Sequence, residues 1–293
     1  MLNLNIDTLI VFGLLSLAML SVWLPARLVV LKIPVWMGLF GLSALGGFYF
    51  NIVEAGGVLY LAALMLLCHL TVTEKFPAPL RVACGFMVVG LVVLLFLHAV
   101  PYFHNPPVFD NVYLSERSTA YTKYWNYDKA AAGLIMLAYF GEICRSAVCF
   151  KNTFRLAWPA ALITVVVTLS LAAGSGYLAP DFKFGTTILV WAWGNLFFTC
   201  VAEEMLFRGV VQRYLSVLNP SRTYRLFIVA LVGVLFGLAH SGGGPVYVVL
   251  ASVAGIGYGY VYYRSGRIET AILTHFLLNA AHVVFFTYPM LRI

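Results

Sequence analysis

The sequence predicts an all-α protein, a polytopic bundle of transmembrane helices. Of its 293 residues, 62% are hydrophobic and only 10% are charged, and the mean hydropathy is +0.93. Soluble domains do not have that balance. The apolar residues gather in repeated runs of about 20, the length that a helix needs to cross the hydrocarbon core. We therefore expect a multi-pass integral membrane protein whose surroundings are a lipid bilayer.

About ten such runs follow one another along the chain. We expect spans at 8–25, 33–53, 56–73, 82–100, 130–148, 156–178, 187–208, 225–240, 246–263 and 270–288. The fifth has the weakest pattern because Glu142 and Arg145 interrupt it. If it does not cross, only the first half of the chain changes orientation. A boundary near residue 150 divides an N-terminal bundle, 1–150, from a C-terminal part, 151–293, that holds nearly every intramembrane polar group.

The net charge of +7 is a signal of membrane topology. The basic residues stand in short connections rather than on one face, so we expect no nucleic-acid partner. With ten spans, thirteen of the 18 lysines and arginines fall on one side. The other side receives the remaining five: Arg117, Lys123, Lys129, Lys183 and Arg292. The positive-inside rule then places the first side in the cytoplasm and both termini outside.

Two further features are weaker signals. The longest polar connection, 101–128, is rich in proline and aromatic residues, which favours an aromatic belt at the headgroups. A lid or a docking loop is the alternative. The five cysteines lie in or beside apolar segments without CxxC spacing, so we expect neither disulfides nor a cysteine-ligated metal.

Glu203, Glu204 and Arg208 stand near the end of the seventh span. A charged side chain in lipid costs of order 2.5–3.5 kcal/mol on insertion scales and marks a functional site by default. Glu204 and Arg208 are four residues apart and can pair on one helical face. Glu203 is rotated by about 100° and has no partner at that spacing. We therefore expect Glu203 to be free for chemistry; the alternative is a structural charge cluster at a helix end.

Three more polar groups lie in the last spans. His240 ends the eighth, and His275 and Asn279 share one face of the tenth. Each is costly alone in lipid, so we expect all three to converge with Glu203. One difficulty is depth. If the eighth span starts at 225, His240 lies nearer the outer face than Glu203. Convergence then requires residues 219–224 to lie at the interface, or the turn 241–245 to lie deep in the bundle.

Together these groups suffice for peptide hydrolysis. A desolvated glutamate can act as general base toward water, and a neighbouring histidine can orient that water or carry its proton. An imidazole N–H and an amide can stabilise an oxyanion. No serine or cysteine stands with a base at a recognisable spacing, which disfavours a nucleophilic triad. Zinc held by Glu203, His240 and His275 is the alternative. Because the HExxH spacing is absent, we expect no cofactor.

Three motifs, in this order, resemble those of the CPBP (Abi) family, intramembrane proteases similar to type II CAAX prenyl endopeptidases: Glu203-Glu204-x-x-x-Arg208, Phe236-x-x-x-His240 and His275-x-x-x-Asn279. The resemblance covers about residues 155–288 and does not reach the first four spans. It implies that 151–293 is a protease core and that the enzyme is of the glutamic type, without metal.

The resemblance also implies a role for each residue. Glu203 would activate water with His240, and His275 and Asn279 would form the oxyanion site. Glu204 and Arg208 would support them. We expect an endopeptidase of a bacterial inner membrane that cuts a membrane-associated peptide or protein near the cytoplasmic leaflet. The rival is a non-enzymatic membrane protein, either a proton-coupled transporter or a scaffold for secretion or immunity.

Overall fold

The structure, a computed structural model, describes residues 2–24 and 33–292. Arg27 and Lys32, two of the basic residues on the predicted cytoplasmic side, lie outside these ranges. The first elements are α1 Ile6–Ser21, α2 Val35–Tyr49, α3 Ala55–Val72, α4 Ala78–Phe96, β1 Pro107–Val112, β2 Tyr121–Tyr124, α5 Tyr127–Phe140 and α6 Ala147–Gly174. Then follow α7 Thr186–Gly194, η1 Asn195–Cys200, α8 Val201–Glu204, η2 Met205–Gln212, α9 Arg213–Ser216, α10 Arg222–Leu238, η3 Ser241–Gly243, α11 Gly244–Ser265 and α12 Ile268–Phe285.

The predicted helical membrane bundle is confirmed. Every predicted span contains a helix, and the seventh is the continuous run from α7 to α9. In the part of the chain that the structure describes, five helical segments are long and apolar enough to cross a membrane: α3, α4, α6, the segment Ser241–Ser265 and α12. The helices α1 and α2 are apolar but shorter. The count of ten crossings therefore stays a prediction.

The ends of the helices follow from local sequence. Asn5, Ser146 and Ser221 precede α1, α6 and α10, and the side chain of each accepts a hydrogen bond from a backbone N–H of the first turn. Such caps satisfy donors that the helix itself leaves free. Gly266 ends α11 in the left-handed conformation, with φ of 63°. A residue with a side chain is strained there, so glycine is the favoured stop.

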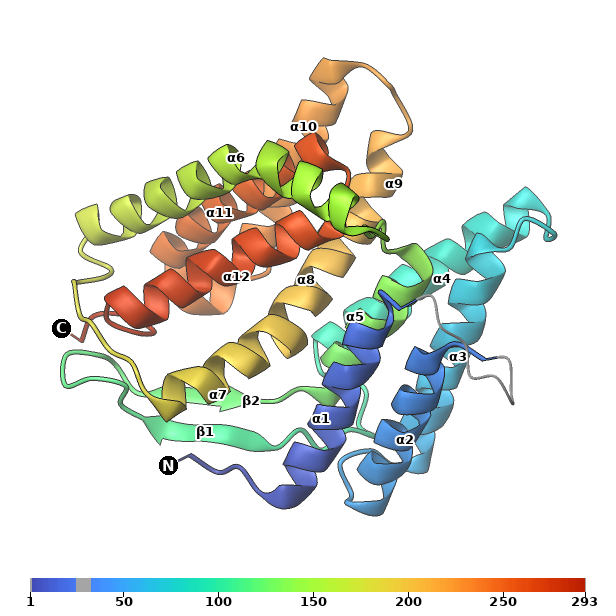
Figure 1. Ribbon diagram of the computed structural model, residues 1–293, viewed down its shortest axis with the longest axis horizontal. Helices are drawn as coiled ribbons and strands as arrows, with labels where there is room; N and C mark the ends of the chain where they lie inside the picture. Colours follow the sequence, from blue (N-terminus) through green and yellow to red (C-terminus); the bar gives the residue numbers. More distant parts are fainter. Residues whose placement is uncertain (1, 25–32, 293) are drawn as a thin grey trace.

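The connection 101–128 is more ordered than the sequence indicates. It contains the antiparallel pair β1 and β2, with Val112 opposite Tyr121. Leu2 forms an isolated bridge with Phe109, and Leu291 forms one with Ser118. Figure 1 shows the hairpin beside both termini, at one end of the molecule. The two ends of the chain thus meet on this hairpin.

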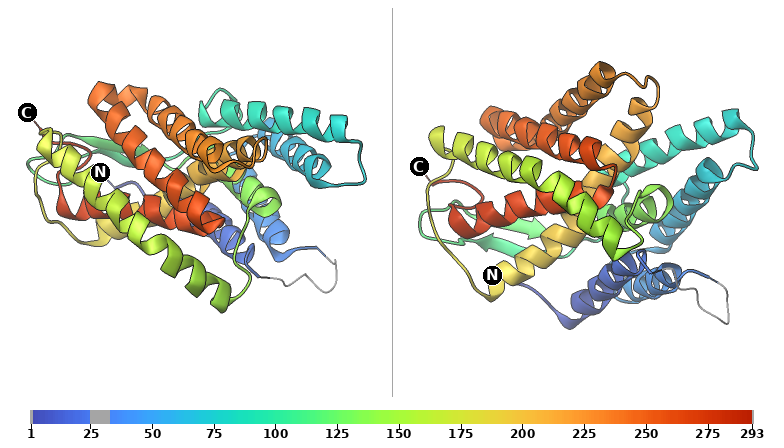
Figure 2. Two further views of the ribbon diagram at one scale, coloured as in Figure 1. Left: turned by 90° about the horizontal axis from the view of Figure 1, so that it is seen from above. Right: turned by 45° about the horizontal axis from the view of Figure 1, so that its top comes forward.

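The helices form two groups with α5 and the run α7–α9 between them. The helices α1–α4 lie on one side, and α6, α10, α11 and α12 lie on the other (Figures 1 and 2). The α10–α11 pair is close because both helices carry small residues. A Cβ atom at Gly237 would lie 2.6 Å from the carbonyl oxygen of Val248, and one at Gly255 would lie 2.9 Å from that of Gly233. This packing fixes the end of α10, where His240 follows.

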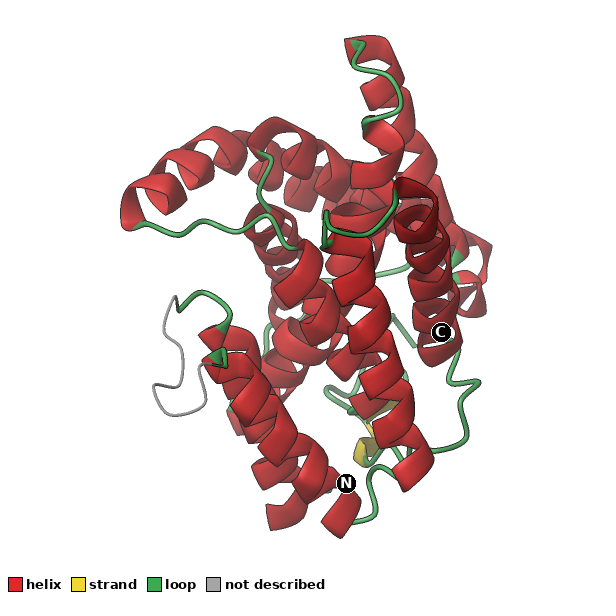
Figure 3. Ribbon diagram, turned by 90° about the vertical axis from the view of Figure 1, so that its right-hand side faces the viewer, coloured by secondary structure: helices red, strands yellow, loops and turns green. Residues whose placement is uncertain are grey.

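The α9–α10 hairpin resolves the difficulty over the depth of His240. Figures 1 and 3 show that this hairpin projects beyond the neighbouring helices. The first turns of α10 therefore lie outside the bundle (Figure 1), and its C-terminal end lies at the depth of α8, which carries Glu203. The turn after it is the short 3-10 helix η3, which reaches the central cavity through Gly242 and Gly243.

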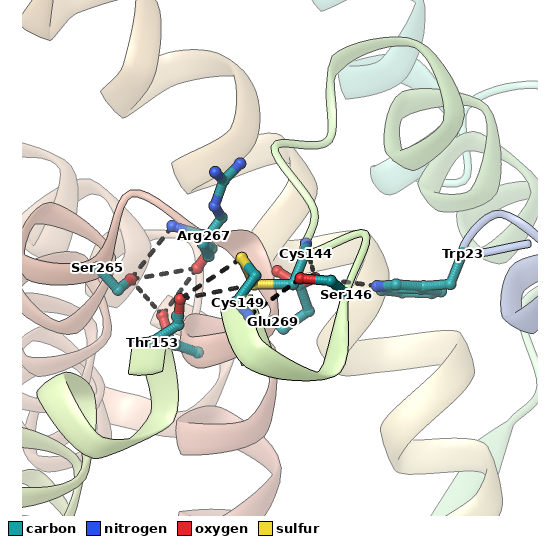
Figure 4. Close-up of a disulfide and its surroundings, with 9 residues drawn as sticks. Trp23, Cys144, Ser146, Cys149, Thr153, Ser265, Arg267 and Glu269 are labelled. Carbon is teal, nitrogen blue, oxygen red and sulfur yellow. Dashed lines mark hydrogen bonds between the residues drawn. A yellow bond between two sulfur atoms is a disulfide. The ribbon is translucent and has the colours of Figure 1, made fainter. Parts of the chain in front are cut away.

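One prediction about the cysteines is wrong. Cys144 and Cys149 form a disulfide between the α5–α6 connection and the first turn of α6 (Figure 4). The chain reverses there, which brings their Cα atoms to 5.5 Å, a separation typical of disulfides. The backbone N–H of Cys144 also donates to Glu269 at the start of α12, 2.5 Å away. Cys68, Cys84 and Cys200 are free and buried.

Candidate active site

Glu203 and Glu204 lie on α8, a single α-helical turn between the π-helices η1 and η2. A π-helix has one extra residue per turn, is rare, and is frequent at functional sites because it rotates the residues that follow. Both glutamates are buried, Glu203 to 6% exposure and Glu204 to none. The two carboxylates have different partners, as their rotation about the helix predicts.

The predicted Glu204–Arg208 pair is present. Nη1 of Arg208 donates to Oε1 of Glu204 at 3.0 Å, and both side chains are fully buried. Nη2 of Arg208 donates to the carbonyl oxygen of Gly255 at 2.6 Å, which ties η2 to α11. The guanidinium also lies over the ring of Phe236, 4.8 Å from its centroid. A buried charge with several partners of this kind holds neighbouring helices together.

Glu203 is not free, which corrects the sequence-based expectation. Nζ of Lys129, in the first turn of α5, donates to Oε1 of Glu203 at 2.6 Å. The two residues are 74 positions apart, so no helical spacing could predict the pair. Both side chains are mostly buried, with exposures of 15% and 8%. The second oxygen of Glu203, Oε2, is buried and has no hydrogen-bond partner among the described residues.

That second oxygen faces two imidazole rings. Nε2 of His240 lies 3.9 Å from Oε2, and Nε2 of His275 lies 4.0 Å from it. These distances are too long for direct hydrogen bonds and suit a bridging water molecule. The structure thus brings together Glu203, His240 and His275, three of the four groups that the sequence predicts to converge.

The other ring nitrogens fix both imidazoles. Nδ1 of His240 lies 2.7 Å from the carbonyl oxygen of Phe236 and must donate, because a carbonyl only accepts. Nδ1 of His275 lies 2.8 Å from Oε1 of Glu204. The ring of Tyr258 stacks on His275, with centroids 4.7 Å apart. In each ring, the nitrogen toward Glu203 is the one left for chemistry.

Asn279 stands one turn beyond His275 on α12 and lines the same cavity. Its Nδ2 donates to Oδ1 of Asn195 at 3.3 Å. Sequence reasoning missed Asn195, which lies in η1 and is 7% exposed. The available signal was a polar series at positions 195, 199 and 203 on one helical face of an apolar run. Asn195 orients the amide of Asn279 toward the cavity.

The cavity around these groups has a volume of about 810 Å³. Residues of α6, α10 and α11 form its apolar wall. Its polar end is formed by β2 and the C-terminal segment, through Tyr121, Lys123 and Tyr288. At this end, burial together with the charge of Lys129 lowers the pKa of Lys123 to about 8. Because β2 and the C-terminal segment line it, the cavity reaches the face of the molecule that carries both termini. The charge bias predicts this face to be outside, and the expected cut near the cytoplasmic leaflet stays a prediction.

The described residues contain no group of three or more histidine, cysteine, aspartate or glutamate side chains placed to hold a metal ion. Zinc ligands lie about 2.0–2.2 Å from the metal. Glu203, His240 and His275 are the candidates for such a site, but the first already pairs with Lys129 and the last with Glu204.

A helical membrane bundle in which buried glutamate and histidine side chains line a cavity is compatible with an intramembrane hydrolase. Comparison with known families makes this specific: residues 185–281 match the family model for type II CAAX prenyl endopeptidase Rce1-like proteins. The chain therefore carries an Rce1-like domain of the CPBP family at these residues, and this match supports a CAAX-protease-type endopeptidase. No curated protein and no solved structure matches the chain. The match covers about a third of the chain and includes every predicted site residue, but not Lys129.

Proposed function

We propose that this protein is an intramembrane endopeptidase that hydrolyses a peptide bond with water activated by Glu203 and His240. The observation that carries this proposal is the unpartnered, buried Oε2 of Glu203, held about equally far from two imidazole nitrogens. A water molecule there can donate one hydrogen to the carboxylate and one to Nε2 of His240. Its lone pair then points away from both toward the cavity.

The reaction balances with these residues alone. The water oxygen attacks the peptide carbonyl carbon as Glu203 takes the proton. The carbonyl oxygen becomes an oxyanion that accepts hydrogen bonds from the amide of Asn279 and from Nε2–H of His275 in its doubly protonated form. The C–N bond then breaks, and the proton passes from Glu203 to the leaving amine. Water supplies the hydroxyl group of the new carboxylate and the hydrogen of the new amine. No metal enters this scheme.

The cavity favours a peptide or protein substrate at the membrane. Its apolar wall, which includes Leu169, Leu250 and Ala254, suits a hydrophobic segment, and its polar end reaches β2 and the C-terminal segment. The substrate in this proposal enters from the face that carries both termini. The N-terminal bundle, 1–150, supplies part of the site through α5, and the core, 151–293, supplies the rest.

The decisive experiment compares membrane proteins from cells that carry the wild type, Glu203→Gln or Glu54→Gln. Glu54 is an exposed carboxylate paired with His104 and serves as the matched control. Mass spectrometry of new chain termini should find products in the wild type and in Glu54→Gln, and uncut precursors in Glu203→Gln. Identical termini in all three strains would contradict the proposal. Glu203-dependent, pH-coupled uptake in place of cleavage would instead favour the transporter.

A further inference from the structure

Among the residues that the structure describes, Lys129 is the charged residue from outside the matched domain that forms an ion pair with Glu203. It lies on α5, whereas the match covers residues 185–281. Its Nζ donates to Oε1 of Glu203 at 2.6 Å and lies 4.9 Å from the ring centroid of Phe96 on α4. The cation is therefore held between the catalytic helix run and the N-terminal bundle.

The first turn of α5 is anchored so that Lys129 has a fixed position. Asp128 is 1% exposed and accepts hydrogen bonds from three groups. These are Nδ1 of His98 at 2.7 Å, Nδ2 of Asn105 at 3.1 Å and the backbone N–H of Lys129 at 2.7 Å. Asn105 in turn accepts from the backbone N–H of Tyr127 at 2.7 Å. A network this well satisfied is rigid.

A close helix approach brings Lys129 within reach of Glu203. One turn after Lys129, Gly133 lies against α8, and a Cβ atom at Gly133 would be only 2.7 Å from the Cα of Ala202. No larger residue permits that separation without moving the helices apart. Ala202 is the residue before Glu203, so this contact holds α5 close to the helical turn that carries Glu203.

The ion pair leaves the two oxygens of Glu203 with different tasks. Oε1 is occupied by Lys129, and Oε2 alone faces His240 and His275. Burial by itself favours the neutral acid, which cannot take a proton from water. A cation within hydrogen-bond distance has the opposite effect and keeps the carboxylate charged.

We propose that Lys129 is a positioning residue that keeps Glu203 ionised and turns Oε2 toward the water-binding position between the two imidazoles. This inference rests on the proposed function for its catalytic meaning, but the ionisation that it predicts does not require a substrate. It also gives the N-terminal bundle a role, because α5 completes the site that the matched domain begins.

The test is infrared titration of the purified protein in lipid nanodiscs. The C=O band of a protonated carboxylic acid is distinct from that of a carboxylate, and the band lost in Glu203→Gln identifies Glu203. In Lys129→Met, the acid band of Glu203 should appear about 1–3 pH units higher than in the wild type, the usual effect of removing one adjacent opposite charge. Lys129→Arg, which restores the charge, should return the titration toward the wild type.

The matched control is Lys183→Met. Lys183 also forms an ion pair, with Asp181 at 3.3 Å, but it does not line the cavity. Its loss should leave the Glu203 band unchanged. A titration in Lys129→Met that coincides with the wild type would overturn the proposal, and so would a Lys129→Arg variant that behaves like Lys129→Met.

A folding defect in Lys129→Met would still be informative. If it arises from an unpaired carboxylate, the double variant Lys129→Met, Glu203→Gln should accumulate like Glu203→Gln alone. A defect that persists in the double variant would mean that Lys129 acts by packing, and would overturn the proposal. Absence of peptidase activity with a shifted infrared titration would refute only the proposed function. Once a substrate is known, the acid limb of kcat/KM should shift in Lys129→Met as the band does.

Discussion

Glu204 holds His275 in place by a hydrogen bond from Nδ1 of the imidazole to Oε1 of the carboxylate, 2.8 Å long. The same oxygen accepts from Arg208, and a carboxylate oxygen only accepts, so the ring N–H of His275 is the donor. A neutral His275 then has a bare Nε2 and cannot donate to an oxyanion. It can donate there only when the ring carries hydrogens on both nitrogens.

The first prediction compares Glu204→Gln with Glu203→Gln. Glu204→Gln leaves Arg208 without its buried partner, which typically costs 3–5 kcal/mol, so its folded yield in membranes should fall. Glu203→Gln should accumulate better, because the Lys129 side chain that loses its partner is 15% exposed, whereas Arg208 is fully buried. Both should lack cleavage activity. Size-exclusion chromatography gives the yields, and equal folded yields of the two variants would contradict the assigned roles.

The sequence predicts those contacts of the site that lie within a single helix. Glu204 with Arg208, and His275 with Asn279, are four residues apart on single helices, so a periodicity of 3.6 places them together. A polar side chain such as that of His240 is costly in lipid, which predicts that His240 lies with the other polar groups of the site. The sequence did not predict the roles of Lys129 and Asn195. The contact of Lys129 with Glu203 joins helices far apart in the chain, and the position of Asn195 depends on the π-helix η1. The β1–β2 hairpin and the Cys144–Cys149 disulfide were not predicted either, because each depends on how a connection folds back on the helical bundle.

The second prediction concerns metal. If Glu203 and His240 alone activate water, the purified enzyme should keep full activity after exhaustive treatment with chelators. Metal content measured by mass spectrometry should not follow activity. Stoichiometric zinc that restores activity on re-addition would instead place the metal on Glu203, His240 and His275.

The third prediction uses the lowered pKa of Lys123, about 8. The unfolded chain has an ordinary lysine pKa near 10.4, so between these values the unfolded state binds more protons. Stability should therefore rise as the pH increases from about 8 to about 10. Lys123→Met should unfold at a higher temperature than the wild type at pH 7, and its stability should rise less over this range. A melting temperature with the same pH dependence in both proteins would contradict this account.

The fourth prediction fixes the orientation of the cavity. Glu116, in the β1–β2 connection, and Asn219, between α9 and α10, are both exposed. Figure 1 shows the β1–β2 connection at the left and the α9–α10 connection at the top, well apart from each other. In spheroplasts, Glu116→Cys should react with a membrane-impermeant thiol reagent, and Asn219→Cys should react only after permeabilisation. The native free cysteines are buried and give a low background. The reverse labelling pattern would place the polar end of the cavity in the cytoplasm.

The last prediction tests the oxyanion site. Asn279 donates one amide hydrogen to Asn195 and has a second for an oxyanion. Asn279→Ala should therefore lower kcat by roughly 10²–10³-fold with little change in KM, the usual effect of losing one oxyanion donor. Asn195→Ala should lower kcat less, because Asn195 acts through Asn279.

His282 provides the internal control for that test. It lies one turn beyond Asn279 and lines the cavity, but its Nε2 donates to the carbonyl oxygen of Thr287 at 3.1 Å, and its ring packs on Tyr288. This hydrogen bond holds the C-terminal segment on α12 and leaves no N–H on Nε2 for a substrate. His282→Ala should therefore leave kcat nearly unchanged in steady-state assays. If it abolishes turnover while Asn279→Ala is mild, the oxyanion site lies one helical turn further along α12 than we assign it.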